Sequence, residues 1–213
     1  MSFNQEFIQF SLEHQILKFG EFVTKAGRLS PYFFNAGLFN TGNKLRVLGQ
    51  FYAKAILNSG VEFDMLFGPA YKGISLAAAT SIALAELGRD VPFAFNRKEV
   101  KDHGEGGNLI GAPLTGRILV IDDVISAGTS VGESVTLINQ NQAVLAGVVI
   151  ALDRMEKGKG TQSAVQEVSE RYSVPVISIA NLNDLLFHLS QTDAADLKAF
   201  LPKVEAYRAQ YGV

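Results

Sequence analysis

The 213-residue chain contains no cysteine, which excludes disulfide bonds, thiolate catalysis and cysteine-ligated metal sites. No uncharged apolar stretch reaches the roughly 20 residues that a membrane-spanning helix needs. The amino-terminus lacks a basic segment followed by a long apolar run, so we expect neither a signal peptide nor a membrane partner. A formal net charge of −2 gives no electrostatic case for a nucleic-acid partner. These absences fit a cytoplasmic protein.

Two familiar nucleotide-binding motifs are missing as well. No Gly-x-x-x-x-Gly-Lys-Ser/Thr segment occurs, and the pair Gly104 and Gly106 is followed by Leu109 where a dinucleotide motif needs a third glycine. Apolar residues make up 47% of the chain, which is enough to bury a sizeable core. The sequence therefore predicts an ordered domain whose ligand site is of another kind.

Short apolar segments alternate with helical patterns through most of the chain. We expect strands at residues 65–67, 91–96, 118–121, 146–152 and 174–179, and helices at 45–58, 74–87, 130–141 and in the carboxyl-terminal region. Strands that alternate with helices indicate an α/β fold with a mainly parallel central sheet flanked by helices.

The two ends of the chain have a different pattern. Residues 3–17 predict a helix, and short strands at 19–24 and 32–36 flank a turn-like segment at 26–31. We expect both termini to pack together as a small cap over the carboxyl edge of the sheet. The expected organisation is residues 1–40 as the amino-terminal part of the cap, 41–172 as the core with a mobile lid at 97–113, and 173–213 as the last core strand and the helices that pack with the cap.

The clearest functional signal is the segment 118–130, Ile-Leu-Val-Ile-Asp-Asp-Val-Ile-Ser-Ala-Gly-Thr-Ser. An apolar strand brings two acids to its carboxyl end, where ligands of open α/β sheets bind. The small residues 126–128 permit a tight turn, and free N–H groups at the following helix start favour an anion such as phosphate. Asp122 and Asp123 then face ribose hydroxyls or Mg²⁺. The alternative is a solvated turn before an ordinary helix.

This segment resembles the 5-phosphoribosyl-1-diphosphate (PRPP) motif of the type I phosphoribosyltransferases. The resemblance implies that family's fold. It also implies PRPP contacts by Asp122, Asp123, Val124, Ile125, Ser126, Ala127, Gly128, Thr129 and Ser130. Mg²⁺ is then the cofactor, held mainly by PRPP near Asp122 and Asp123, with no direct protein ligand required.

Two segments resemble the orotate phosphoribosyltransferases in particular and indicate the acceptor base. In residues 25–35 the resemblance places Lys25 at the phosphate end, with Phe33 and Phe34 flanking the flat orotate ring and backbone groups bonding its edge. Arg154 matches the residue that holds the orotate carboxylate, for which a guanidinium is well suited. Ser126, where the family often has Thr, keeps a hydroxyl for orotate. The alternatives are core phenylalanines, a solvated lysine and a surface Arg–Asp pair.

Two further segments carry positive charge that suits a diphosphate. Tyr71 and Lys72 match the family's diphosphate loop, where a strained or cis peptide is implied near Tyr71. The glycine-rich residues 97–113 indicate a lid that opens and closes. Its Arg97, Lys98, Lys101 and His103 would contact the diphosphate. The alternatives are an ordinary loop with an exposed lysine and a solvated surface loop.

The resemblance implies transfer of the 5-phosphoribosyl group from PRPP to orotate in pyrimidine biosynthesis, with Lys101, His103, Asp122 and Asp123 as catalytic residues. It also implies a homodimer whose lid completes the neighbouring site. One alternative is a related enzyme that acts on a purine or uracil, against which Arg154 and the phenylalanines argue. Another is a non-catalytic PRPP sensor, which has no need of a basic lid.

Overall fold

The computed structural model describes residues 2–24, 26–101, 107–126, 128–158 and 160–213. In these ranges a six-stranded central sheet has the order β5-β4-β3-β6-β7-β8. Its strands are β3 (Met65–Gly68), β4 (Phe93–Lys101), β5 (Gly107–Gly111), β6 (Arg117–Ile121), β7 (Val144–Asp153) and β8 (Val176–Asn181). Neighbouring strands are parallel except for the antiparallel β4–β5 pair. The predicted α/β fold with a mainly parallel sheet is confirmed.

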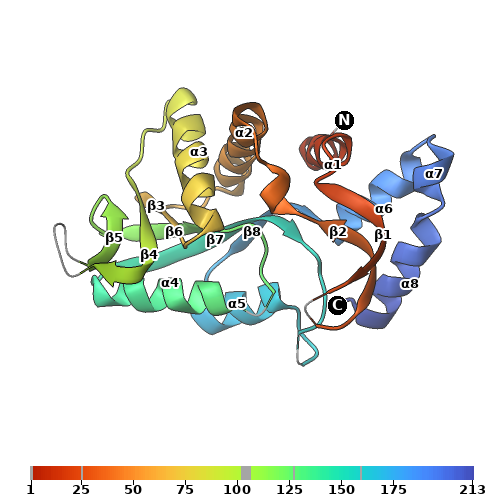
Figure 1. The fold of residues 1–213 in the computed structure, drawn as a ribbon. Coiled ribbons are helices and arrows are strands. Elements are labelled where there is room, and N and C mark those ends of the chain that lie inside the picture. The colour runs from red at the N-terminus through yellow and green to blue at the C-terminus, as the bar shows by residue number, and fades with distance from the viewer. Residues whose placement is uncertain (1, 25, 102–106, 127, 159) are drawn as a thin grey trace.

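Helices cover both faces of this sheet (Figure 1). They are α2 (Gly42–Ser59) and α3 (Lys72–Glu86) on one face, and α4 (Thr129–Gln140) and α5 (Ala164–Tyr172) on the other. Strand β6 shows why two faces are needed: its Leu119 and Ile121 pack into one core cluster, and its Ile118 and Val120 into the other. Successive side chains of a strand point to opposite faces, so a strand this apolar is stable only when both faces are covered.

The strand order brings three connecting loops to one edge of the sheet. Strand β6 lies between β3 and β7, with Phe67 opposite Val120 and Ile121 opposite Val149. Beyond the end of β6, the main-chain N–H of Ala151 donates to the carbonyl of Asp123 at 2.9 Å. The loops that follow β3, β6 and β7 are therefore neighbours at the carboxyl edge.

Segments from the two ends of the chain lie side by side at one end of the sheet (Figure 1). They are α1 (Phe3–Glu13), β1 (Leu17–Val23), β2 (Leu29–Phe34), the short 3-10 helix η1 (Ala36–Leu38), α6 (Leu182–Gln191), α7 (Ala195–Lys198) and α8 (Leu201–Tyr211). The β1–β2 hairpin is a separate antiparallel sheet. Helix α8 packs against it, where the rings of Tyr32 and Tyr207 meet edge to face at 6.2 Å. Gln5 of α1 donates to the carbonyl of Asp184 in α6 at 2.9 Å.

Two predicted loops contain strand instead. Residues 26–31 were expected to form a turn, but 29–31 belong to β2. A proline is compatible with this strand because β2 pairs with β1 alone among the described strands and so has an unpaired edge. Residues 97–113 were expected to form a lid loop, but β4 continues to Lys101 and the chain returns as β5. A charged hairpin at a sheet edge has a polar composition like that of a loop. The lid residues 102–106 lie outside the described residues.

Helix α5 was not expected from the sequence, although its start carries a recognisable signal. The hydroxyl of Ser163 accepts from the main-chain N–H of Gln166 at 3.1 Å, and the Gln166 side chain accepts from the N–H of Ser163 at 2.8 Å. This reciprocal capping box is a known signature of a helix amino-terminus. Within the described ranges, every helix is too short or too polar to span a bilayer.

Candidate functional site

The loop between β6 and α4 holds its two acids in a fixed arrangement. Asp122 and Asp123 are buried, with 8% and 7% of their surface exposed. The two carboxylate oxygens of Asp122 accept from the N–H of Asp123 and from the hydroxyl of Ser130, both at 2.9 Å. Those of Asp123 accept from the N–H of Val124 at 2.9 Å and from the ammonium of Lys72 at 2.5 Å. All four oxygens have a partner, so the loop is organised before any ligand binds.

Burial raises the pKa of one acid in this loop and of a tyrosine that contacts it. It raises the pKa of the Asp122 carboxyl to about 6, and the negative charge of Asp123 acts in the same direction. The hydroxyl of Tyr52 in α2 donates to the main-chain carbonyl of Asp122 at 2.7 Å. Burial raises the pKa of the Tyr52 phenol well above its ordinary value, so this hydroxyl stays protonated and able to donate in alkaline solution as well.

The start of α4 is suited to an anion. Gly128 precedes the helix with φ of 68°, in the left-handed region that glycine adopts without steric cost. No side chain in the described part of the chain caps this helix start, so the N–H groups of its first turn are available. The hydroxyl-bearing Ser126 and Thr129 are exposed beside it, whereas Val124 and Ile125 pack against the core.

The loop between β3 and α3 is pressed directly against the β6 loop. A Cβ built on Gly73 would lie 2.9 Å from the carbonyl oxygen of Ile121 and 2.6 Å from Cδ of Pro69, so only glycine fits there. This contact explains how Lys72, the first residue of α3, reaches Asp123 while its own side chain remains 58% exposed. The Ala70–Tyr71 peptide is cis, as the family resemblance implied.

Strand β4, whose last residues belong to the predicted lid segment, contacts this second loop. The side-chain carbonyl of Asn96 accepts from the N–H of Ala70 at 2.8 Å, and the ammonium of Lys98 lies 5.3 Å from the centre of the Tyr71 ring. A cavity of about 220 Å³ lies between the two segments, lined by Tyr71, Ile74, Phe95, Asn96, Arg97, Lys98 and Glu99. The basic residues at the base of the lid are thus adjacent to the β3–α3 loop.

At the other end of the site, Arg154 follows β7 and is held on several sides. Its Nε and Nη2 lie 2.8 Å and 2.6 Å from one oxygen of Glu156, and Nη2 donates to the hydroxyl of Ser30 at 3.0 Å. The guanidinium carbon lies 4.2 Å from the centre of the Tyr32 ring. The alternative reading of Arg154 as an exposed partner of an aspartate is wrong, because its partner is Glu156 and its side chain is only 20% exposed.

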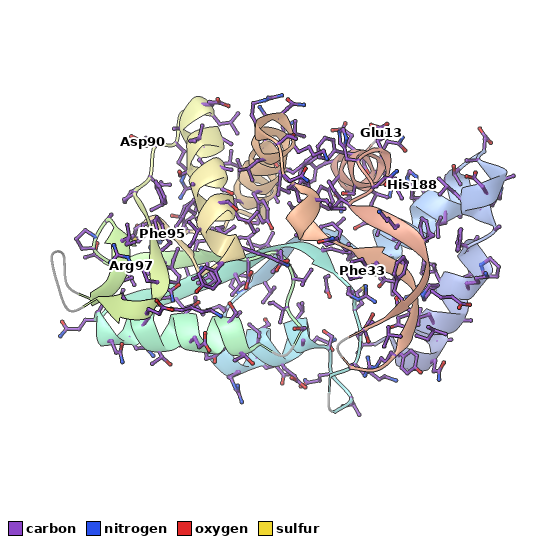
Figure 2. The ribbon with its side chains drawn as sticks, viewed as in Figure 1. Glu13, Phe33, Asp90, Phe95, Arg97 and His188 are labelled. Atoms are coloured by element: carbon purple, nitrogen blue, oxygen red, sulfur yellow. The ribbon has the colours of Figure 1, made fainter. Side chains whose placement is uncertain are left out.

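The adjacent phenylalanines of β2 have different surroundings. Phe33 is 42% exposed and stacks on Phe22 with ring centres 5.4 Å apart, whereas the Phe34 ring packs near Phe7 and Phe39 at 6.2 Å and 6.3 Å. The partly buried Phe34 ring therefore packs against the core, and Phe33 is the more exposed of the two. A contact from the Phe34 backbone to the ligand stays a prediction. Phe33 and Arg97 lie toward opposite ends of the molecule (Figure 2).

The structure therefore brings the predicted residues together in two groups, one around Asp123 and Lys72 and the other around Arg154. Lys25, Ala127 and His103 lie outside the described residues, as does the side chain of Lys101. Sequence reasoning missed Tyr52, Asn96 and Glu156. Tyr52 and Asn96 lie far along the chain from the loops that they contact, so no local pattern identifies them. Of these three residues, only Glu156 had a signal in the sequence, because it is an acid two residues after Arg154.

The donor set restricts how a metal ion binds here. Among the described residues, no group of three or more His, Cys, Asp or Glu side chains could enclose an ion. The carboxylates of Asp122 and Asp123 are hard oxygen donors of the kind that Mg²⁺ prefers, but hydrogen bonds and Lys72 already engage them. These residues fit a Mg²⁺ ion that takes most of its ligands from a bound substrate and water.

Comparisons with known proteins agree with this geometry. The family model described as phosphoribosyl transferase domain matches residues 38–180. The chain is 66% identical to the orotate phosphoribosyltransferase of Laribacter hongkongensis over 211 residues, covering 99% of this chain and 98% of that one. It is 65% identical to that of Chromobacterium violaceum with the same coverage. The crystal structure of orotate phosphoribosyltransferase from Francisella tularensis superposes with a TM-score of 0.88 at 44% identity, covering 98% of this chain and 100% of that one.

Proposed function

The chain belongs to the orotate phosphoribosyltransferase family, and from this membership we propose that it transfers the 5-phosphoribosyl group of PRPP to orotate. The products are orotidine 5′-monophosphate (OMP) and diphosphate, in pyrimidine biosynthesis. The observation that best supports this function is the pre-formed loop of Asp122 and Asp123, which has Lys72, from the loop after β3, on one side and Arg154, which follows the neighbouring strand β7, on the other.

In this reaction the ring N–H of orotate loses its proton and the nitrogen forms a bond to C1 of the ribose, while the bond from C1 to the diphosphate breaks and the diphosphate leaves with the bonding electrons. Positive charge develops on the ribose and negative charge on the departing diphosphate. Asp122 and Asp123 orient the ribose hydroxyls and stabilise the positive charge, while the N–H groups and hydroxyls at the start of α4 bind the 5-phosphate. Catalysis then depends mainly on positioning and electrostatics.

Lys72 has two partners in this proposal. Without substrate its ammonium pairs with Asp123, and its exposed side chain is long enough to turn toward an arriving diphosphate. Exchanging one anionic partner for another releases Asp123 to the ribose as the diphosphate binds. The stem of Lys72 at the start of α3 keeps the ammonium within reach of both.

Mg²⁺ is the proposed cofactor, held mainly by PRPP near Asp122 and Asp123. When bound, it neutralises charge on the diphosphate. From the lid, Arg97, Lys98, Lys101 and His103 provide further positive charge, and Lys101 or His103 donates a proton to the leaving group. The position of Lys98 beside Tyr71 supports placing this positive charge next to the proposed diphosphate loop.

The remaining proposals concern organisation. We propose that residues 1–40 and 173–213 act as one cap, that the lid comprises 97–113, and that the enzyme is a cytoplasmic homodimer whose lid completes the neighbouring site. Exposed apolar side chains on α2, on α3 and at the carboxyl cap of α3, namely Leu57, Ile82 and Leu87, support a contact between subunits. Light scattering of the purified protein tests the dimer.

The decisive test of the proposed function is a spectrophotometric assay of orotate consumption. Addition of PRPP and Mg²⁺ to enzyme and orotate should remove the orotate absorbance, with OMP and diphosphate formed in equal amounts. A panel with uracil, adenine, guanine and hypoxanthine serves as the control. Turnover of one of these bases in preference to orotate would overturn the assignment, as would PRPP binding without any turnover.

A further inference from the structure

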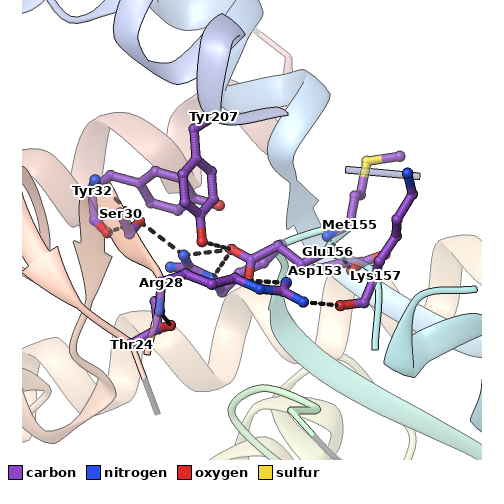
Figure 3. Close-up of polar contacts among 10 residues, drawn as sticks. Thr24, Arg28, Ser30, Tyr32, Asp153, Met155, Glu156, Lys157 and Tyr207 are labelled. Carbon is purple, nitrogen blue, oxygen red and sulfur yellow. Dashed lines mark hydrogen bonds and ion pairs between the residues drawn. The ribbon is translucent and has the colours of Figure 1, made fainter. Parts of the chain in front are cut away.

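Side chains from three separate segments of the chain, among them those of Arg28, Glu156 and Tyr207, form a cluster of polar contacts (Figure 3). Arg154 belongs to this cluster. The central residue is Glu156, which none of the substrate-contact assignments includes. One of its carboxylate oxygens accepts from Nε and Nη2 of Arg154 and also from the hydroxyl of Tyr207 at 3.1 Å. Its other oxygen faces a guanidinium nitrogen of Arg28 at 3.6 Å.

Arg28 is itself fixed in place. Its Nη2 donates to the main-chain carbonyl of Lys157 at 2.9 Å, and its guanidinium carbon lies 4.9 Å from the centre of the Tyr211 ring. The nearby carboxyl of Asp153 accepts from the N–H of Met155 at 2.8 Å and so is bonded to the main chain rather than to either guanidinium. The cluster therefore places a single carboxylate between two guanidinium groups.

This arrangement has two consequences for Arg154. First, Glu156 shares its negative charge between two cations, so Arg154 keeps positive charge that can attract a substrate carboxylate. Second, Glu156 and Ser30 engage Nε and Nη2, and among the described residues no partner engages Nη1. A guanidinium held along one edge presents its remaining N–H groups in a fixed direction, which reduces the entropy lost when it binds a carboxylate.

We propose that Glu156 is a positioning residue for recognition of the substrate carboxylate: together with Arg28 and Tyr207 it fixes the guanidinium of Arg154 and leaves its free edge for the ligand. This inference rests on the proposed function, since it takes the carboxylate to be that of orotate. It adds to that function a set of residues that set the preference for an anionic pyrimidine without touching it.

The alternative is that the cluster only ties the cap to the core, because Arg28 and Tyr207 come from β2's connecting turn and from α8. The two readings differ in what a substitution changes. A structural tie affects stability and all ligands equally. A positioning role affects ligands that carry the carboxylate and spares those that lack it.

The test compares two nucleotides that differ in that carboxylate alone, OMP and uridine 5′-monophosphate, by calorimetric titration of the full-length enzyme. We expect Glu156→Ala to reduce the ratio of OMP affinity to uridine monophosphate affinity about tenfold, the range for lost charge-assisted hydrogen bonds. The orotate KM should rise by a similar factor while the PRPP KM stays close to wild type. Glu156→Gln, whose amide oxygen can still accept from Arg154, should restore part of the ratio.

One control and one second test variant make the result decisive. Glu62→Ala removes a carboxylate from another glutamate–arginine pair, that with Arg117 at 3.6 Å, and should leave the ratio unchanged. Tyr207→Phe removes one hydrogen bond to Glu156 and should lower the ratio about threefold, which also decides the matter if Glu156→Ala does not fold.

An unchanged ratio in Glu156→Ala, or in Tyr207→Phe should the former not fold, would overturn the inference. So would a higher ratio, since Glu156 would then compete with the substrate. Failure of the proposed function is a different result, because wild-type enzyme would then fail to consume orotate.

Discussion

The two ends of the site are built in different ways. One end is the loop between β6 and α4, the proposed phosphate-binding end. There the partners of the two acids lie mostly within the same loop: Asp122 and Ser130 are eight residues apart, and Asp123 bonds to the next residue in the chain. The other end is the group around Arg154, the proposed site of the orotate carboxylate. There Arg154 and Ser30 are 124 residues apart, and Glu156 and Tyr207 are 51 residues apart. One end is formed by a local segment and the other by the tertiary fold.

This difference matches the chemistry of the two ligands. A phosphate and a ribose can be bound by main-chain N–H groups, hydroxyls and two carboxylates from one short loop. Recognition of a particular base needs side chains on several elements, held at a fixed distance from that loop. The acceptor specificity of such a fold can therefore change at the cap while the loop stays the same.

The largest expected effect comes from the phosphate end. Asp123→Asn keeps the size of the side chain but removes its charge and its ion pair with Lys72. We expect kcat to fall by about 100- to 1,000-fold, the range for loss of one electrostatic contact to a transition state. Steady-state kinetics with both substrates check this, and the orotate KM should change little. A rise in orotate KM as large as the fall in kcat would mean that the two ends are not separate.

An intermediate effect is expected from Tyr52→Phe, which removes the buried hydroxyl that donates to the Asp122 carbonyl. Loss of that bond leaves a buried carbonyl unpaired, so kcat/KM for PRPP should fall about tenfold. Orotate KM should remain near wild type. Tyr172→Phe in α5 is the matched control and should have no effect. Equal changes in kcat/KM for PRPP and for orotate would show that Tyr52 supports the whole fold rather than this loop.

The smallest expected effect is a shift in the pH dependence of kcat in Ser130→Ala. Burial raises the pKa of Asp122, and the hydroxyl of Ser130 opposes that rise. Ser130→Ala removes this opposition, so the pKa should increase further and the acidic limb of kcat should move to higher pH by about half a unit. Rates measured between pH 5 and 9 with saturating substrates, compared with wild type, check this. A shift to lower pH would show that ionised Asp122 does not control the limb.

The same difference between the ends explains how much the sequence predicted. The strand–acid–acid–loop–helix order of residues 118–130 was confirmed because most hydrogen bonds of its two carboxylates lie within the segment itself. Lys72 was identified by its loop, although its pairing with Asp123 depends on the strand order and could not be seen. Tyr52 lies in the middle of an ordinary amphipathic helix, where nothing distinguishes a core tyrosine from one that supports a loop.

At the cap end, the sequence identified residues but not their arrangement. Arg154 was predicted to hold the orotate carboxylate, without the residues that hold Arg154 itself. Ser30 contacts it from 124 residues away, and Tyr207 contacts Glu156 from 51 residues away, so these contacts depend on the tertiary fold. The contrast between Phe33 and Phe34 follows from their alternation along β2, which began earlier than predicted. The first part of β4 was predicted as a strand, but the rest of the β4–β5 hairpin was predicted as a loop, because an exposed sheet edge carries the same polar residues.

The most direct test of the division into two ends is the pair of KM values for Arg154→Ala. Loss of charge-assisted hydrogen bonds to the orotate carboxylate should raise the orotate KM at least about tenfold. The PRPP KM should stay within about twofold of wild type, because the β6 loop does not depend on Arg154. A PRPP KM that rises as much as the orotate KM, or an orotate KM that does not change, would contradict a carboxylate site at Arg154 separate from the phosphate loop.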